Sequence, residues 1–243
     1  MGNLFGYPEF DENGEKILTT YDNDYKDMLM DIRVYRMKAG DTKEFFKPEE
    51  EMAVLLIKGE LTYKWGQEEK KVYRKDVFTD GLYALHVCKG TKVTVTAGSD
   101  AEILVQCTDN VREFDAKFYD PENTPWIYSC KDKFGGTAKR RVNTAFDYET
   151  APYSNMVLGE VLNDPGNWSG YIPHTHPQPE TYYFLFLFPA DSLRICDALV
   201  YFIFSLVRMS ELFLAFLDLQ AVLFGKALLL VYPDRNACSA VAE

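Results

Sequence analysis

Short apolar runs separated by turn residues constrain the fold of this chain more than any other feature. Between Met28 and Gln106, apolar residues come mostly in runs of about four to seven, bounded by Gly, Asp, Lys and Pro. Such runs are typical of β-strands, and no stretch of useful length has the period of a helix. The runs are Ile32 to Met37, Met52 to Ile57, Leu61 to Trp65, Val77 to Phe78, Tyr83 to Cys88, Thr91 to Thr96 and Ala101 to Cys107. We therefore predict an all-β barrel or sandwich here.

A second β pattern follows a polar stretch. Between Thr108 and Thr150 the chain is rich in charged and turn-forming residues, and apolar runs resume near Met156. This organisation predicts two β domains in tandem, without a clear internal repeat. The predicted segments are an N-terminal extension (1–27), a first domain (28–110), an interdomain connection (111–150), the start of a second domain (151–183) and an atypical apolar tail (184–243).

The tail is almost wholly Leu, Phe, Val, Ile and Ala from Phe184 to Val231. Charged residues divide it into pieces shorter than the roughly 18 uninterrupted apolar residues of a membrane span, so a membrane anchor is disfavoured. A buried helix could start at Ser210 and end near Gly225. The abrupt change after Tyr183 is also what a reading-frame shift in the coding sequence would produce. The interrupting residues are Arg208, Glu211, Asp218 and Lys226.

Composition excludes several classes of partner and site. The chain has 37 acidic and 26 basic residues and a net charge of −11, which argues against nucleic acid and against an anionic membrane surface. Its five cysteines include no Cys-x-x-Cys pair, so neither a disulfide framework nor a thiolate zinc site is indicated. No secretory signal is recognisable at the N-terminus, and we expect a cytoplasmic protein.

A histidine pair carries the clearest chemical signal. His174 and His176 are two apart, and in an extended strand such residues point to the same side. Pro177 and Pro179 then force a turn, after which Glu180 can supply a carboxylate beside the imidazoles. This donor set suits Zn, Mn, Fe, Co or Ni and leaves coordination positions for substrate oxygens. The alternative is a pair of polar residues on a proline-rich turn.

Three further side chains, of a histidine, a tryptophan and an arginine, are candidates for a role in the fold or the site. His86 alternates with apolar residues and has no second histidine or acid close by in sequence, so we predict a core or rim histidine rather than a ligand. Trp168, six residues before His174, could line the mouth of the site, although packing is the usual role of tryptophan. Arg141 could bind a substrate carboxylate, or lie in a solvated linker.

The string from Val157 to His176 closely resembles the bicupin family of 5-deoxy-glucuronate isomerases from myo-inositol catabolism. The resemblance runs from about Asp31 to Tyr183. Matching residues elsewhere are Ala53 to Glu60, Asp76 to Phe78, Tyr83 to Leu85, Gly90-Thr91 and Arg140 to Val142.

The resemblance implies two tandem cupin (jelly-roll-like) barrels, with a divalent metal, Zn or Mn, only in the second. His174, His176 and Glu180 match the family's ligand positions, while Arg141 and Trp168 become candidates for substrate binding. The implied reaction converts the sugar acid 5-deoxy-glucuronate to 2-deoxy-5-keto-gluconate through an enediolate, which a metal would stabilise. The sequence does not identify the proton-transferring group. A homo-oligomer would also fit, because cupins are commonly dimers or larger.

The chain departs from the family pattern after Tyr183. Cupins usually add a histidine from a second motif, but no histidine follows His176. We therefore expect an incomplete second barrel. Two alternatives stay open: a non-catalytic cupin that binds a sugar acid, and an isomerase of 5-keto-4-deoxyuronate, which the Pro165-Gly166-Asn167-Trp168-Ser169 string favours less.

Overall fold

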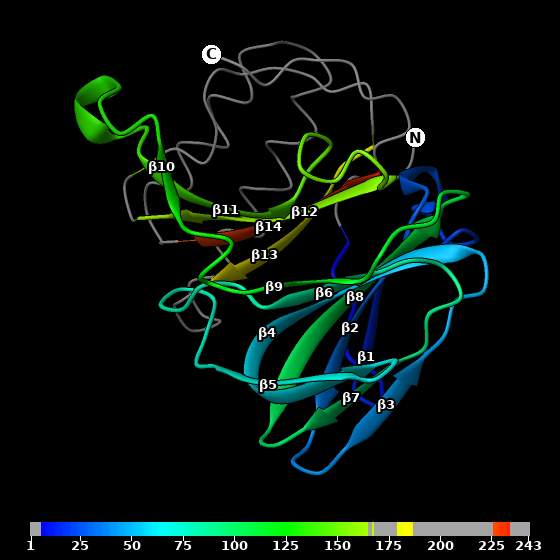
Figure 1. Ribbon diagram of the computed structural model, residues 1–243. Coiled ribbons are helices and arrows are strands. Elements are labelled where there is room, and N and C mark those ends of the chain that lie inside the picture. The colour runs from blue at the N-terminus through cyan, green and yellow to red at the C-terminus, as the bar shows by residue number, and fades with distance from the viewer. Residues whose placement is uncertain (1–5, 165–166, 168–178, 187–225, 234–243) are drawn as a thin grey trace.

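The computed structural model describes residues 6–164, 167, 179–186 and 226–233 (Figure 1). Its regular structure is almost entirely antiparallel β, as predicted, and forms a nine-stranded first sheet and a five-stranded second sheet. Two short 3-10 turns, Lys26–Met28 and Phe134–Gly136, interrupt the strands. In this described part of the chain, no helix has the length and apolar character required to cross a membrane.

The first sheet contains strands β1 to β9. Its order is β1-β2-β8-β4-β6-β9. In addition, β5 and β7 pair with β4, and β3 pairs with β7. The bounds are β1 Glu15–Thr19, β2 Asp31–Met37, β3 Thr42–Phe45, β4 Glu50–Trp65, β5 Glu68–Arg74, β6 Ala84–Val87, β7 Val93–Ala97, β8 Ala101–Asp109 and β9 Lys117–Tyr119.

One bent strand turns this sheet into a barrel. The first part of β4 pairs with β6 and β8, and its residues from Leu61 to Trp65 pair with both β5 and β7. Gly59 lies between the two parts with φ +101°, and a Cβ there would stand 2.5 Å from the carbonyl oxygen of Asp100. Only glycine fits that conformation and that close approach. The sheet therefore folds over on itself in the jelly-roll manner of a cupin.

An apolar core fills the first barrel. We call it the inner core. Side chains from both halves of the sheet meet there almost without solvent exposure. Burying each such side chain contributes about 1.5–3 kcal/mol. Burial also raises the pKa of the Cys107 thiol. The inner core comprises Met37, Met52, Val54, Leu56, Leu61, Tyr63, Leu85, Val87, Val93, Val95, Ala97, Ala101, Ile103, Val105 and Cys107.

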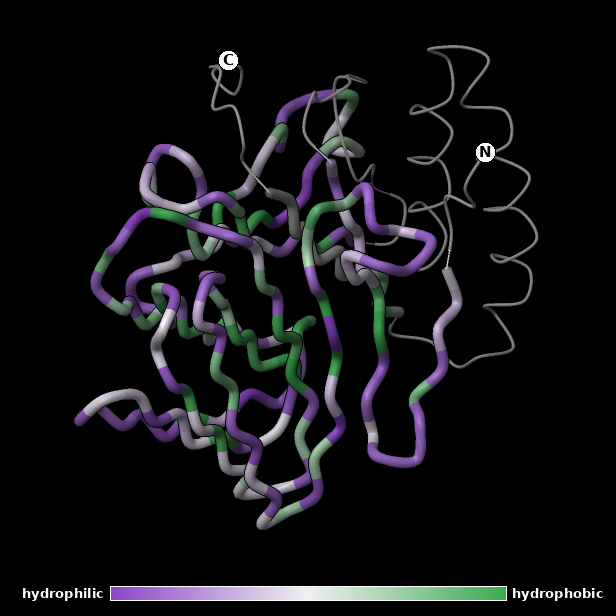
Figure 2. Tube along the Cα trace, turned by 90° about the vertical axis from the view of Figure 1, so that its right-hand side faces the viewer, coloured by the Kyte–Doolittle hydropathy of each residue, from purple (hydrophilic) through white to green (hydrophobic). Residues whose placement is uncertain are grey.

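The second sheet packs on one outer side of the first (Figure 1). Its order is β10-β11-β12-β14-β13. Apolar residues of both sheets form a second cluster, the shared core, in which Leu158 and Phe146 meet Ile32 and Leu55. Figure 2 shows mainly polar loops at the margins of the strands. The bounds are β10 Ile127–Ser129, β11 Arg140–Phe146, β12 Met156–Asn163, β13 Thr181–Phe186 and β14 Lys226–Pro233.

Two pieces of the apolar tail belong to the second sheet. β13 extends to Phe186, and β14 lies between β12 and β13 with antiparallel pairing to both. The helix expected from Ser210 to Gly225 lies outside the described residues. The domain boundaries stay a prediction; within them, β1 lies in the segment 1–27, and β9, β10 and β11 lie in the segment 111–150.

Candidate functional site

The second sheet has two faces of different character. Met156, Leu158 and Leu162 pack in the shared core, so Val157, Gly159 and Val161 point to the opposite side. In β13, Tyr183 and Leu185 pack against the shared core, and Tyr182 and Phe184 alternate with them. We call the face turned away from the first sheet the distal face. Tyr182 and Phe184 are 41% and 39% exposed there, with ring centroids 6.3 Å apart.

Glu180 stands at the entrance to β13 on the distal face. The Tyr182 hydroxyl donates a hydrogen bond of 2.5 Å to Oε2 of the Glu180 carboxylate. This bond restricts the rotation of the carboxylate. A carboxylate oxygen has more lone pairs than one hydrogen bond uses, so the arrangement is compatible with a metal bond to Glu180.

The predicted histidine ligands, His174 and His176, lie outside the described residues, as does Trp168. Their positions stay predictions. The chemistry of the donor set fits a divalent transition metal, because two imidazoles and the Glu180 carboxylate are common ligands of Zn and Mn. Among the described residues, no group of three or more His, Cys, Asp or Glu side chains could hold a metal ion. The predicted site at Glu180 takes its other two ligands from these histidines.

Arg141 lies on the opposite face of the second sheet. It pairs with Leu162, which packs in the shared core. Its guanidinium donates to the carbonyl oxygen of Phe78 at 3.1 Å and lies 5.1 Å from the ring centroid of Trp126. The structure therefore does not bring Arg141 together with Glu180, and it engages the Arg141 guanidinium at the contact between the two sheets.

His86 is a fully buried core histidine, as predicted. Its ring stacks on Phe146 with centroids 4.1 Å apart, and Phe114 lies 4.7 Å away. Its acidic partner is distant in the sequence. Glu51, on the neighbouring strand β4, places Oε2 2.8 Å from His86 Nε2, and both side chains are 0% exposed.

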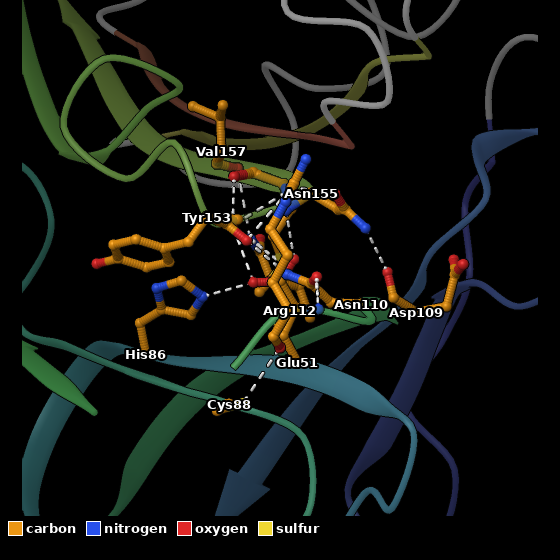
Figure 3. A network of polar contacts seen from close by, with 12 residues as sticks. Glu51, His86, Cys88, Asp109, Asn110, Arg112, Tyr153, Asn155 and Val157 are labelled. Atoms are coloured by element: carbon orange, nitrogen blue, oxygen red, sulfur yellow. Dashed lines mark hydrogen bonds and ion pairs between the residues drawn. The ribbon is translucent and has the colours of Figure 1, made fainter. Parts of the chain in front are cut away.

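Glu51 also connects the first sheet to the start of β12 (Figure 3). Its carboxylate accepts hydrogen bonds from the Ser154 hydroxyl at 2.9 Å and from the Asn155 backbone N–H at 2.5 Å. The Ser154 hydroxyl contacts Glu51 and the carbonyl oxygen of Met156, at 2.9 Å each. Because its hydroxyl bonds to the acid and not to the histidine, Ser154 lacks the base that a nucleophilic serine requires.

A buried ion pair also joins the sheets. Arg74, at the end of β5, donates two hydrogen bonds of 2.8 and 2.7 Å to the two carboxylate oxygens of Glu160 in β12. The side chains are 0% and 5% exposed. Arg74 also donates to the carbonyl oxygens of Leu56 and Asp80. Its bidentate contact is the strong geometry for arginine and a carboxylate.

Most of the chain matches the model of a known protein family. A family model described as the KduI/IolB family matches residues 6–192. The chain belongs to the KduI/IolB family. The matched range includes the His174 to Glu180 motif and continues past Tyr183, where the sequence resemblance ended.

Curated relatives of the chain have the name 5-deoxy-glucuronate isomerase. A 5-deoxy-glucuronate isomerase of Geobacillus kaustophilus (strain HTA426) is 27% identical over 164 residues, covering 63% of this chain and 58% of the relative. The protein of that name from Bacillus subtilis (strain 168) is 23% identical over 201 residues, covering 75% of this chain and 72% of the relative. This KduI/IolB chain thus spans 58% of the length of the Geobacillus relative.

Solved structures support the fold. An IolB-like protein from Salmonella typhimurium LT2 has a TM-score of 0.56 at 20% identity, covering 65% of this chain and 62% of that protein. A putative glyoxylate-induced protein from Pseudomonas aeruginosa has a TM-score of 0.54 at 10% identity, covering 95% and 85%. At these identities the likeness concerns the fold of this KduI/IolB chain alone.

Proposed function

We propose that this chain is a metal-dependent aldose–ketose isomerase that interconverts 5-deoxy-glucuronate and 2-deoxy-5-keto-gluconate. The observation that carries the proposal is the Glu180 carboxylate on the distal face, directly after the His174 to His176 pair. The names of the Geobacillus and Bacillus relatives support the choice of substrate.

Four residues of the chain would have separate roles in binding and orientation. His174, His176 and Glu180 would hold a divalent cation, and the Tyr182 hydroxyl would keep the Glu180 carboxylate oriented. A bound Zn or Mn supplies Lewis acidity, which stabilises negative charge on the carbonyl and hydroxyl oxygens of the sugar acid during proton transfer.

A substrate panel tests the reaction. We expect the full-length chain, loaded with Zn²⁺ or Mn²⁺, to convert 5-deoxy-glucuronate, followed by proton NMR, and to leave 5-keto-4-deoxyuronate unchanged. A preference for 5-keto-4-deoxyuronate would replace the proposed substrate with that of the related uronate isomerase.

Metal content tests the site. Stoichiometric metal in the purified protein should disappear in the His174→Ala, His176→Ala double variant, measured by elemental analysis. The matched control is His86→Gln, since His86 is enclosed by Glu51, Phe114 and Phe146 and should not affect metal content.

A second candidate rests on one specific observation, the absence of histidine after His176. If the site lacks the further ligand histidine that cupins usually have, the chain would be a cupin that binds the sugar acid without turnover. Binding of 5-deoxy-glucuronate by calorimetry, with no product after prolonged incubation, would favour this candidate over the isomerase.

A further inference from the structure

Charged side chains of the first barrel hold β12 at two places. Arg74 binds the Glu160 carboxylate near the middle of the strand, through two hydrogen bonds. Glu51 binds Ser154 and the backbone of Asn155 just before the strand begins. The contact with Glu160 is buried and the contacts with Ser154 and Asn155 are buried or partly buried, and together they join the first sheet to β12 and to the residues just before it.

Stability alone does not account for the Arg74–Glu160 pair. Desolvating two charges costs as much as their attraction returns, and apolar residues of similar size often serve equally well. Arg74 is 0% exposed, and its Nε has no hydrogen-bond partner in the described structure. The Asn143 side chain, which faces the same side because Asn143 pairs with Glu160, is likewise buried and unpaired there. A pair in such a setting is better suited to fixing position, since it fits only one alignment of β12.

The backbone ladder carries this alignment to β13. Leu158 pairs with Val231, and Val231 pairs with Thr181, the neighbour of Glu180. Glu160 pairs with Leu229, which pairs with Tyr183. Glu160, which Arg74 binds, therefore lies in one row of paired residues with Tyr183, and Leu158 lies in one row with Thr181. A shift of β12 would be passed across β14 to β13, because backbone hydrogen bonds along the antiparallel ladders join the three strands.

We propose that the first barrel positions the metal-binding edge of the second sheet, with Arg74 and Glu160 as positioning residues for Glu180. The metal part of this inference rests on the function proposed above. The first barrel thereby has a defined role: it is the template that aligns β12 and, through β14, also β13.

The test replaces the pair by apolar residues of similar size. The Arg74→Met, Glu160→Met double variant should keep a melting temperature close to that of the unchanged chain. Its Zn²⁺ affinity, measured by competition with a chromophoric chelator, should fall on the order of tenfold. Amides of residues 181–186 should exchange with deuterium several-fold faster, measured without added metal. Glu160→Gln leaves the buried Arg74 guanidinium without a counter-charge, so it should change affinity and exchange in the same direction and also lower the melting temperature.

A core variant separates positioning from simple destabilisation. Val95 is 0% exposed in the inner core, so Val95→Ala should lower the melting temperature while leaving Zn²⁺ affinity and β13 exchange unchanged. Unchanged β13 exchange in both the double variant and Glu160→Gln would overturn the positioning role. The same holds if Val95→Ala changes affinity and exchange as much as the double variant does.

The two readouts also separate this inference from the proposed function. If the unchanged chain binds no Zn²⁺, the proposed function fails. Faster β13 exchange in the double variant would then still support the template role of the first barrel, and unchanged exchange would overturn it.

Discussion

The first barrel and the second sheet are built from similar strands but keep solvent out to different degrees. The first barrel encloses an inner core of nearly unexposed side chains, and even its histidine and the paired Glu51 are 0% exposed. The second sheet buries one face in the shared core and carries Glu180, Tyr182 and Phe184 on the other. The side chains of the first barrel thus mainly fill a core, whereas the second sheet leaves part of its distal face exposed to solvent.

The largest expected effect on stability comes from comparing two phenylalanines on opposite faces of the second sheet. Phe146 is 0% exposed and stacks on His86, so Phe146→Ala should cost about 3–5 kcal/mol of unfolding free energy. Phe184 is 39% exposed, and Phe184→Ala should cost less than about 1 kcal/mol. Urea unfolding measures both. Equal losses would contradict the division into a packing face and a distal face.

The next effect concerns the hydrogen bond between Ser154 and Glu51. Ser154→Ala leaves the buried Glu51 carboxylate with one donor fewer, which should cost about 1–3 kcal/mol. Thr42→Ala is the control, because the hydrogen bond between Thr42 and Thr96 is exposed and its loss should fall within about 0.5 kcal/mol. Equal effects of the two variants, in urea unfolding, would argue against a special role of the buried contact.

A third test addresses the distal face itself. Tyr182→Phe removes the hydroxyl that donates to Glu180 and keeps the ring, so Zn²⁺ affinity should fall about tenfold. That change corresponds to about 1.4 kcal/mol. Phe184→Tyr adds a hydroxyl on the same face and should leave the affinity unchanged. A Tyr182→Phe variant that binds Zn²⁺ normally would mean that Glu180 needs no such orientation.

The smallest effect concerns Asp76, in the turn before Phe78, where the two regions meet. Burial acts to raise the pKa of Asp76, but hydrogen bonds from Thr79 and Phe78 outweigh it and lower the pKa below the ordinary 3.8. A lowered folded-state pKa means that the stabilisation is present above about pH 4 and is lost as the pH falls through the folded pKa.

Asp76→Asn should therefore cost less than about 1 kcal/mol at pH 7 and should lose less stability than the unchanged chain on acidification. Urea unfolding at pH 7 and at pH 3 measures both quantities. Parallel losses in the two proteins would show that Asp76 does not contribute to acid sensitivity.

The β class and the burial of His86 could be predicted because they depend on local alternation, which the sequence displays directly. The hydrogen-bonding partners of the buried polar side chains could not be predicted. Glu51 lies 35 residues from His86, and Arg74 lies 86 residues from Glu160, so only the pairing of distant strands reveals them. The strand β14 was also missed, because a continuous apolar run has no period that separates a buried strand from a buried helix. Glu180 was singled out because its signal, a short motif, is local.

The place of β14 has a consequence for how the molecule is made. Residues 226–233 insert between two strands that leave the ribosome much earlier, and in the described sheet β13 has no other strand neighbour. The first barrel can close while synthesis continues, whereas β13 must wait for β14 to emerge. During that interval the nascent chain presents an unpaired strand edge to chaperones and to other chains.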